Sequence, residues 1–276
     1  MATAAFFLIA CQKTELKHAA TLDRASLMEL PFPGWRADAK AKIQSVNLSA
    51  LAEEKNKASE AATRAEVTPI YVVKLDDTHA TLLTQTLPVN DGDEPIDCHA
   101  CSGTIGAYFF EQDAAGWQLT SRQDAVAQSG VQGHIGDTSI SKLTDGHFAL
   151  TAEWGSCWQG YCGSWLVVVG LQRDNATLLA PGIPLSVDND GAHGACSALD
   201  APEESEAEPN AHECMDIRSK WKFQGNRLVA RFEGRLNQVD SNGKPSPTKK
   251  IQQQAVYEVA QGQLSLVKGT NPVPGF

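Results

Sequence analysis

Trp165-Leu166-Val167-Val168-Val169 (WLVVV) is the longest apolar run in the body of this 276-residue chain, and it continues through Gly170-Leu171. After the turn residues Asp174-Asn175, a second apolar stretch follows at Thr177–Ala180. Apolar runs on both sides of a short polar turn are typical of a β-hairpin. A helix needs about 18 apolar residues to cross a bilayer. The segment therefore predicts two paired strands and no membrane span.

Five further segments have the same design, with two β-favouring stretches separated by Gly, Asn or Asp. They are Ile70–Val73 with Ala80–Leu83, Thr104–Glu111 with Trp117–Thr120, Ser139–Leu143 with His147–Ala152, Ile217–Phe223 with Leu228–Phe232, and Gln252–Val259 with Leu264–Val267. Successive hairpins without intervening helices predict a mainly β fold, an antiparallel hairpin-rich sandwich or barrel, over residues 67–276. Because the turns are unevenly spaced, an irregular β-propeller is the less favoured alternative.

Residues 12–66 differ from the rest because they are rich in Ala, Lys and Glu and nearly neutral. Apolar residues recur there at helical spacing until Pro31-Phe32-Pro33-Gly34 ends the pattern. A second helix is expected from Ser49, a suitable N-cap, to about Glu66. We therefore predict a tether and short helical extension in residues 12–66, followed by the β domain.

The chain carries 23 Lys and Arg residues against 33 Asp and Glu residues, a formal net charge of -10. A protein that binds a phosphate backbone needs a basic surface, so we expect no nucleic-acid partner. Two acidic stretches, Asn90–Asp97 and Ala201–Asn210, are expected to be solvated loops.

The N-terminus holds an apolar stretch, Ala4–Ala10, that runs into Leu8-Ile9-Ala10-Cys11. This tetrapeptide resembles the lipobox of bacterial lipoproteins, a resemblance limited to these residues and the apolar run. It implies that residues 1–11 comprise a signal peptide and its lipidation site, with Cys11 the acylated first residue of the mature chain. Gln12 implies sorting to the outer membrane. The expected location is the periplasm, anchored to the outer membrane through Cys11.

The other six cysteines form three local pairs: Cys98 and Cys101, Cys157 and Cys162, Cys196 and Cys214. An even number of cysteines in an exported chain indicates disulfides, and the short separations favour sequential pairing over the other connectivities. The alternative is a cytosolic protein with scattered buried thiols.

The first pair encloses His99 and resembles the redox centre of thioredoxin-like oxidoreductases. Such a centre needs its first cysteine at a helix N-terminus, whereas the residues after Cys101 favour a strand. We therefore predict a structural bridge. The alternative is an envelope thiol-disulfide protein or another enzyme centred on this segment. Because no established catalytic motif is present, a binding protein is favoured over an enzyme.

The second pair lies in Trp154–Trp165, which holds four large aromatic residues and three glycines in twelve positions. A Cys157–Cys162 bridge would present Trp158, Gln159 and Tyr161 on a pre-ordered loop, as an interface hot spot or a sugar-stacking platform requires. The alternative is that the rings fold back onto the β core.

Ser102-Gly103, with Tyr108 five positions after the glycine, is similar to the inhibitory loop of periplasmic lysozyme inhibitors. The resemblance implies an exported β protein that blocks a cell-wall hydrolase, with Ser102 and Tyr108 in the contact. His99 is a further candidate binding residue near this segment.

Asp188-Asn189-Asp190-Gly191 matches the opening of many calcium loops. The twelfth position from Asp188 is Leu199 instead of a bidentate Glu, which excludes a standard EF loop. A simple Asp/Asn/Gly turn is favoured over a calcium site, and no other cofactor is expected.

These features together favour an exported, lipid-anchored envelope protein that recognises another protein. An inhibitor or immunity factor against a basic cell-wall hydrolase is the specific form we consider, because an acidic surface accelerates encounter with a basic partner. Besides the thiol-disulfide alternative, a carbohydrate-binding module using Trp158 and Tyr161 is considered.

Overall fold

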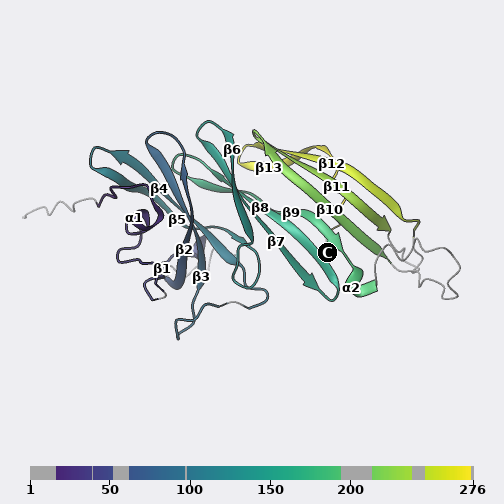
Figure 1. Cartoon of the computed structure of the whole chain (residues 1–276), viewed down its shortest axis with the longest axis horizontal. Coiled ribbons are helices and arrows are strands. Elements are labelled where there is room, and N and C mark those ends of the chain that lie inside the picture. The colour runs from purple at the N-terminus through teal and green to yellow at the C-terminus, as the bar shows by residue number, and fades with distance from the viewer. Residues whose placement is uncertain are drawn as a thin grey trace, which may run out of the picture.

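The computed structural model describes residues 17–38, 40–51, 62–96, 98–193, 213–237 and 246–274. The chain is mainly β, and the strands of the described residues are arranged in two sheets, with neighbouring strands antiparallel (Figure 1). The predicted antiparallel, hairpin-rich fold is confirmed, and no propeller blades are seen in these ranges. No helix in the described part is long and apolar enough to span a membrane.

The first sheet has five strands in the order β1-β2-β3-β4-β5. Their bounds are Ile43–Val46 (β1), Thr63–Lys74 (β2), His79–Pro88 (β3), Gly103–Asp113 (β4) and Gly116–Ser129 (β5). The order in space is the order in the chain, so the sheet is a meander.

The second sheet has eight strands in the order β13-β12-β11-β10-β9-β8-β7-β6 and is also a meander. Because the sheet curls into a half-barrel, β13 contacts β9, although three strands lie between them (Figure 1). The bounds are Asp137–Thr144 (β6), His147–Trp158 (β7), Tyr161–Leu171 (β8), Ala176–Asp188 (β9), Cys214–Gln224 (β10), Arg227–Asn237 (β11), Lys249–Ala260 (β12) and Gln263–Gly269 (β13).

Strand β8 contributes to two cores because its successive side chains point to opposite faces. Leu166 and Val168 pack into the half-barrel core, which also contains Leu228 and Phe232. Val167, Val169 and Leu171 pack against residues of the first sheet in the intersheet core. The apolar run of β8 therefore lies between two layers of buried side chains, as expected of a strand covered on both sides.

Strand β4 has the equivalent position in the first sheet. Ile105 and Phe109 belong to the intersheet core. Tyr108 and Phe110 face the other way, into an N-terminal core that also contains Phe32. The segment before β2 therefore covers the outer face of the first sheet.

The N-terminal segment differs from its prediction. Helix α1 spans only Arg24–Met28, with Asp23 as its N-cap, and a 3-10 helix covers Ser49–Leu51. The helix expected up to Glu66 is wrong at its C-terminal end, because Thr63–Glu66 pairs with β1 as the start of β2. Ala65 pairs with Gln44 of β1 and is buried in the N-terminal core, and these interactions outweigh its helix propensity. Residues 52–61 lie outside the described ranges, and the boundary placed between residues 66 and 67 falls inside β2.

Arg122 on β5 joins this segment to the first sheet. Its guanidinium donates to both carboxylate oxygens of Asp124, at 2.7 and 3.0 Å, and to the carbonyl oxygens of Pro31 and Ser45, at 2.9 and 3.1 Å. Asp124 also accepts from the hydroxyl of Tyr108 at 2.9 Å. Burial, together with the nearby carboxylate, raises the pKa of Tyr108 well above its ordinary range. The network holds the chain at Pro31 and Ser45 against the first sheet.

His79 connects turns of the two sheets. Its side chain is buried, with Nδ1 2.8 Å from Asp76 Oδ1, and Arg173 Nε donates to Nε2 at 2.6 Å. Asp76 lies in the β2–β3 turn and Arg173 in the β8–β9 turn. The hydrogen bond to His79 lowers the pKa of Asp76 to about 2.

Val168→Ala is expected to lower the free energy of unfolding by about 2 kcal/mol, because it leaves a cavity in the half-barrel core. Val267→Ala on β13 is the matched control, since that side chain is 56% exposed and its truncation removes little buried area. Urea unfolding of both variants measures the difference. Equal losses would contradict the assignment of β8 to the core.

Asp76→Asn is expected to destabilise the protein at neutral pH by less than about 1 kcal/mol, because the carboxylate is partly exposed. The folded pKa of about 2 lies below the ordinary 3.8, so the stabilisation is present above pH 3.8 and is lost as the pH falls through about 2. Urea unfolding across this range should show the variant and wild type converging in acid. Asp77→Asn, at the fully exposed neighbouring position, is the control for the same change of charge.

Candidate functional site

The β7–β8 hairpin ends in a two-residue turn at Gln159-Gly160, between the paired residues Trp158 and Tyr161. Both turn residues have positive φ, 51° and 86°, which is the signature of a type I′ turn. Cys157 and Cys162 lie directly opposite each other and form the predicted disulfide. The hairpin tip is therefore fixed by both its turn and its bridge.

The second predicted bridge, Cys98–Cys101, is also present, in the loop before β4. The Cys101 amide donates to the Cys98 carbonyl at 2.8 Å, and the chain then enters the strand at Gly103. No helix begins at Cys98, so the loop lacks the helix dipole that stabilises a redox-active thiolate. This geometry matches a structural bridge.

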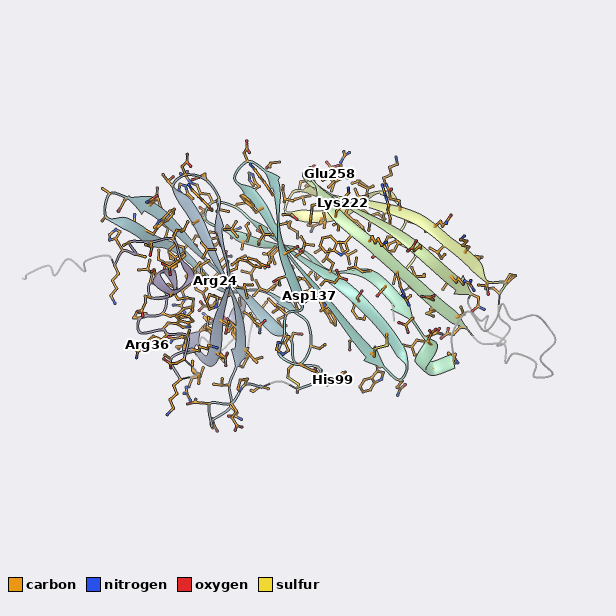
Figure 2. The ribbon with its side chains drawn as sticks, in the orientation of Figure 1. Arg24, Arg36, His99, Asp137, Lys222 and Glu258 are labelled. Atoms are coloured by element: carbon orange, nitrogen blue, oxygen red, sulfur yellow. A yellow bond between two sulfur atoms is a disulfide. The ribbon has the colours of Figure 1, made fainter. Side chains whose placement is uncertain are left out.

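The two bridged loops meet at their aromatic residues. The ring centroids of His99 and Trp158 lie 6.1 Å apart, with the planes tilted by 36°. His99, labelled in Figure 2, precedes a strand of the first sheet, and Trp158 ends a strand of the second, so packing of the two sheets brings them together. His99, Gln159 and Trp158 are all exposed, Trp158 at 67%. We call these three residues the Trp158 surface.

Tyr161 lies directly opposite Trp158 in the hairpin and is partly buried. Its hydroxyl donates a short hydrogen bond to Glu213 and lies 3.0 Å from His193 Nε2. The hydrogen bond to Glu213 raises the pKa of the Tyr161 phenol above its ordinary value. Trp158 is thus exposed, whereas the hydroxyl of Tyr161 joins the hairpin to Glu213.

The hairpin tip packs closely against helix α2, Asp190–His193. A Cβ added at Gly160 would lie 2.3 Å from the backbone of Gly191, so only glycine fits there. Asn189 before the helix is fully buried, accepts from the Met215 amide at 2.9 Å and donates to the Glu213 carbonyl at 3.0 Å. Its side-chain amide is therefore engaged in joining β9 to β10.

The calcium interpretation of Asp188-Asn189-Asp190 gains no support from this arrangement, because the middle side chain is committed to backbone partners. In the described ranges, no group of three or more His, Cys, Asp or Glu residues is placed to hold a metal ion. Cys214 is disulfide-bonded. Its expected partner, Cys196, lies outside the described residues, as does Cys11.

The inhibitor resemblance implies that Ser102 and Tyr108 contact a partner, but the Tyr108 side chain is not on the surface. Ser102 donates its hydroxyl hydrogen to the Gly130 carbonyl at 2.9 Å, and Tyr108 is fully buried against Phe32. The cause is the position of β4 between two cores, which turns Tyr108 into the protein. The continuous apolar stretch after Gly106 was the sequence signal for this burial.

His193 and Glu213 were missed as site residues. They reach Tyr161 from separate elements 32 and 52 positions away, so no local pattern marks them.

Glu213→Gln is expected to lower the pKa of Tyr161 toward its ordinary value, because the carboxylate that favours the protonated phenol is gone. Ultraviolet titration of tyrosinate, taken as the difference from Tyr161→Phe, isolates this group. Glu233→Gln, an exposed position on β11, should leave the titration unchanged. An unaltered Tyr161 titration in Glu213→Gln would contradict the hydrogen bond.

No protein-family model and no curated protein sequence matches this chain. Two solved structures show a weak similarity, each over 78% of the chain. One is MPT-4, a mannose phosphorylase from Leishmania mexicana, with 11% identity, a TM-score of 0.21 and 55% of that chain covered. The other is an Ntf2-like protein involved in plasmid conjugation, with 9% identity, a TM-score of 0.13 and 81% covered. The chain spans about half the length of the phosphorylase, and at these scores neither similarity carries an argument about fold or function.

Proposed function

We propose that this chain is an exported, disulfide-stabilised protein that recognises another protein through the Trp158 surface. The observation that carries the proposal is the indole of Trp158, which is 67% exposed at the tip of a bridged hairpin. Large aromatic side chains dominate the energetics of many protein interfaces, and truncating one there is usually costly.

The hairpin is held in place before any partner arrives. The Cys157–Cys162 bridge, the close approach of Gly160 to Gly191 and the hydrogen bond from Tyr161 to Glu213 each restrict it. Association then orders few additional groups, so more of the contact energy is available as affinity. This rigidity supports a recognition role for the loop.

The partner we favour is a basic cell-wall hydrolase, with this chain as its inhibitor or immunity factor. The net charge of -10 attracts a basic protein and steers its approach. Asp190 and Glu213 lie on the elements beside the hairpin tip and add negative charge near Trp158. The attraction should weaken with added salt.

Export to the periplasm and anchoring to the outer membrane through acylated Cys11 belong to the same proposal. Disulfides form and persist mainly in oxidising compartments, and two bridges plus the bonded Cys214 are in keeping with such a location. The envelope is also where a cell-wall hydrolase acts.

Trp158→Ala is expected to weaken binding to a basic muramidase such as c-type lysozyme at least tenfold, or about 1.4 kcal/mol. Leu266→Ala on β13, where the side chain is 46% exposed, is the control and should bind like wild type. Surface plasmon resonance gives the affinities, and a lysis assay reports inhibition.

The proposal fails if wild type binds none of a panel of basic muramidases, or if Trp158→Ala binds one as tightly as wild type does. Isolated peptidoglycan provides a separate arm. If peptidoglycan retains wild type but not Trp158→Ala, and no protein partner is bound, the carbohydrate-binding alternative replaces the proposal.

A further inference from the structure

We propose that the hollow between the N-terminal segment and β2 binds a small organic anion. This site is separate from the Trp158 surface and does not depend on the function proposed there. Three cationic side chains line it, those of Arg24, Arg36 and Lys42, in a protein whose net charge is -10.

The hollow has a volume of about 660 Å³, within the range of small-molecule sites. Arg24 comes from α1, and Arg36 and Lys42 come from the chain between α1 and β1. Figure 2 shows Arg24 and Arg36 on the side of the molecule that holds the first sheet. Thr68 and Pro69 line it from β2, beside the register shift between Pro69 and Tyr71. The site therefore lies where the docked segment meets an irregular part of the sheet.

Two of the three cations form long ion pairs within the protein. Arg36 is 3.7 Å from Asp38 and Lys42 is 3.6 Å from Glu66, distances longer than a charge-assisted hydrogen bond. Arg24 has no hydrogen-bond or ion-pair partner in the described part of the chain. Several guanidinium and ammonium donors are thus available to a ligand.

Only one acidic side chain, Glu29, is among the lining residues in the described ranges. Its Oε2 accepts the Gly34 amide hydrogen at 2.9 Å, so part of its charge is already engaged by the turn after α1. Asp38 and Glu66 offset part of the charge of Arg36 and Lys42, so Arg24 is the cation with the most unused donor capacity. An anion in the hollow would accept hydrogen bonds from these donors.

The volume and the lining residues of the hollow restrict the ligand to one chemical class. Trp35 and Pro69 supply apolar wall, and the Trp35 indole is fixed by donating to the Val67 carbonyl at 3.0 Å. The volume exceeds that of an inorganic anion. The ligand that fits has at least two acidic groups, carboxylate, sulfonate or phosphate, on a compact apolar body. A long polyanion is disfavoured because the rest of the surface would repel it.

The test uses the full chain with 8-anilinonaphthalene-1-sulfonate as the fluorescent probe and citrate and inorganic phosphate as competitors. Wild type should bind the probe saturably, and citrate should displace it more effectively than phosphate. The double variant Arg24→Gln/Arg36→Gln should bind the probe at least fivefold more weakly. The control Arg218→Gln/Arg231→Gln removes the same charge from β10 and β11 and should change affinity less than twofold.

The proposal is overturned if the two double variants bind the probe with equal affinity, because the loss of affinity would then reflect the change in net charge alone. Non-saturable probe binding, or phosphate competing as well as citrate, would also overturn it. Urea unfolding of each variant establishes that it is folded, and the single variant Lys42→Gln, which lies outside α1, provides a second measure of the same site.

Discussion

The burial of β8 on both faces is the constraint on which the rest of the structure depends. One strand supplies Val168 to the half-barrel core and Val167 to the intersheet core, so neither core can form in register without the other. A slip of one residue would exchange the two faces of the strand. β4 has the same role in the first sheet, where Phe109 and Tyr108 point to opposite cores. Two doubly buried strands thus align three layers of side chains.

This alignment also positions the candidate recognition surface. His99 and Trp158 belong to loops of different sheets, and no hydrogen bond between the loops needs to be invoked to explain their contact. The relative placement of the loops follows from the packing of β4 and β8 in the intersheet core. The bridges then make each loop stiff enough to keep that placement. An exposed indole is in this way supported by residues far from it in sequence.

The sequence was informative where structure is local. The turns after Asp174 and after Trp158 are set by residues within the hairpins themselves, and cysteines three and five positions apart could be paired by proximity. It was misleading where distant contacts decide. Tyr108 was placed in a binding contact because its burial depends on Asp124 and Phe32, and Thr63–Glu66 was placed in a helix because its partner strand lies some twenty positions earlier. Glu213 had no local signal, and the signal at Asn189 indicated a turn, since the roles of both residues arise only when β9 and β10 are joined.

The meander order of both sheets has a consequence for how the chain acquires its native bonds. Within each sheet every strand pairs with the strand just before it, so a chain that emerges from its N-terminus can complete the first sheet before the second has been synthesised. Cys98 and Cys101 are three positions apart, and Cys157 and Cys162 are five positions apart on neighbouring strands. Each bridge therefore needs only the residues around it to have emerged before its two cysteines can meet.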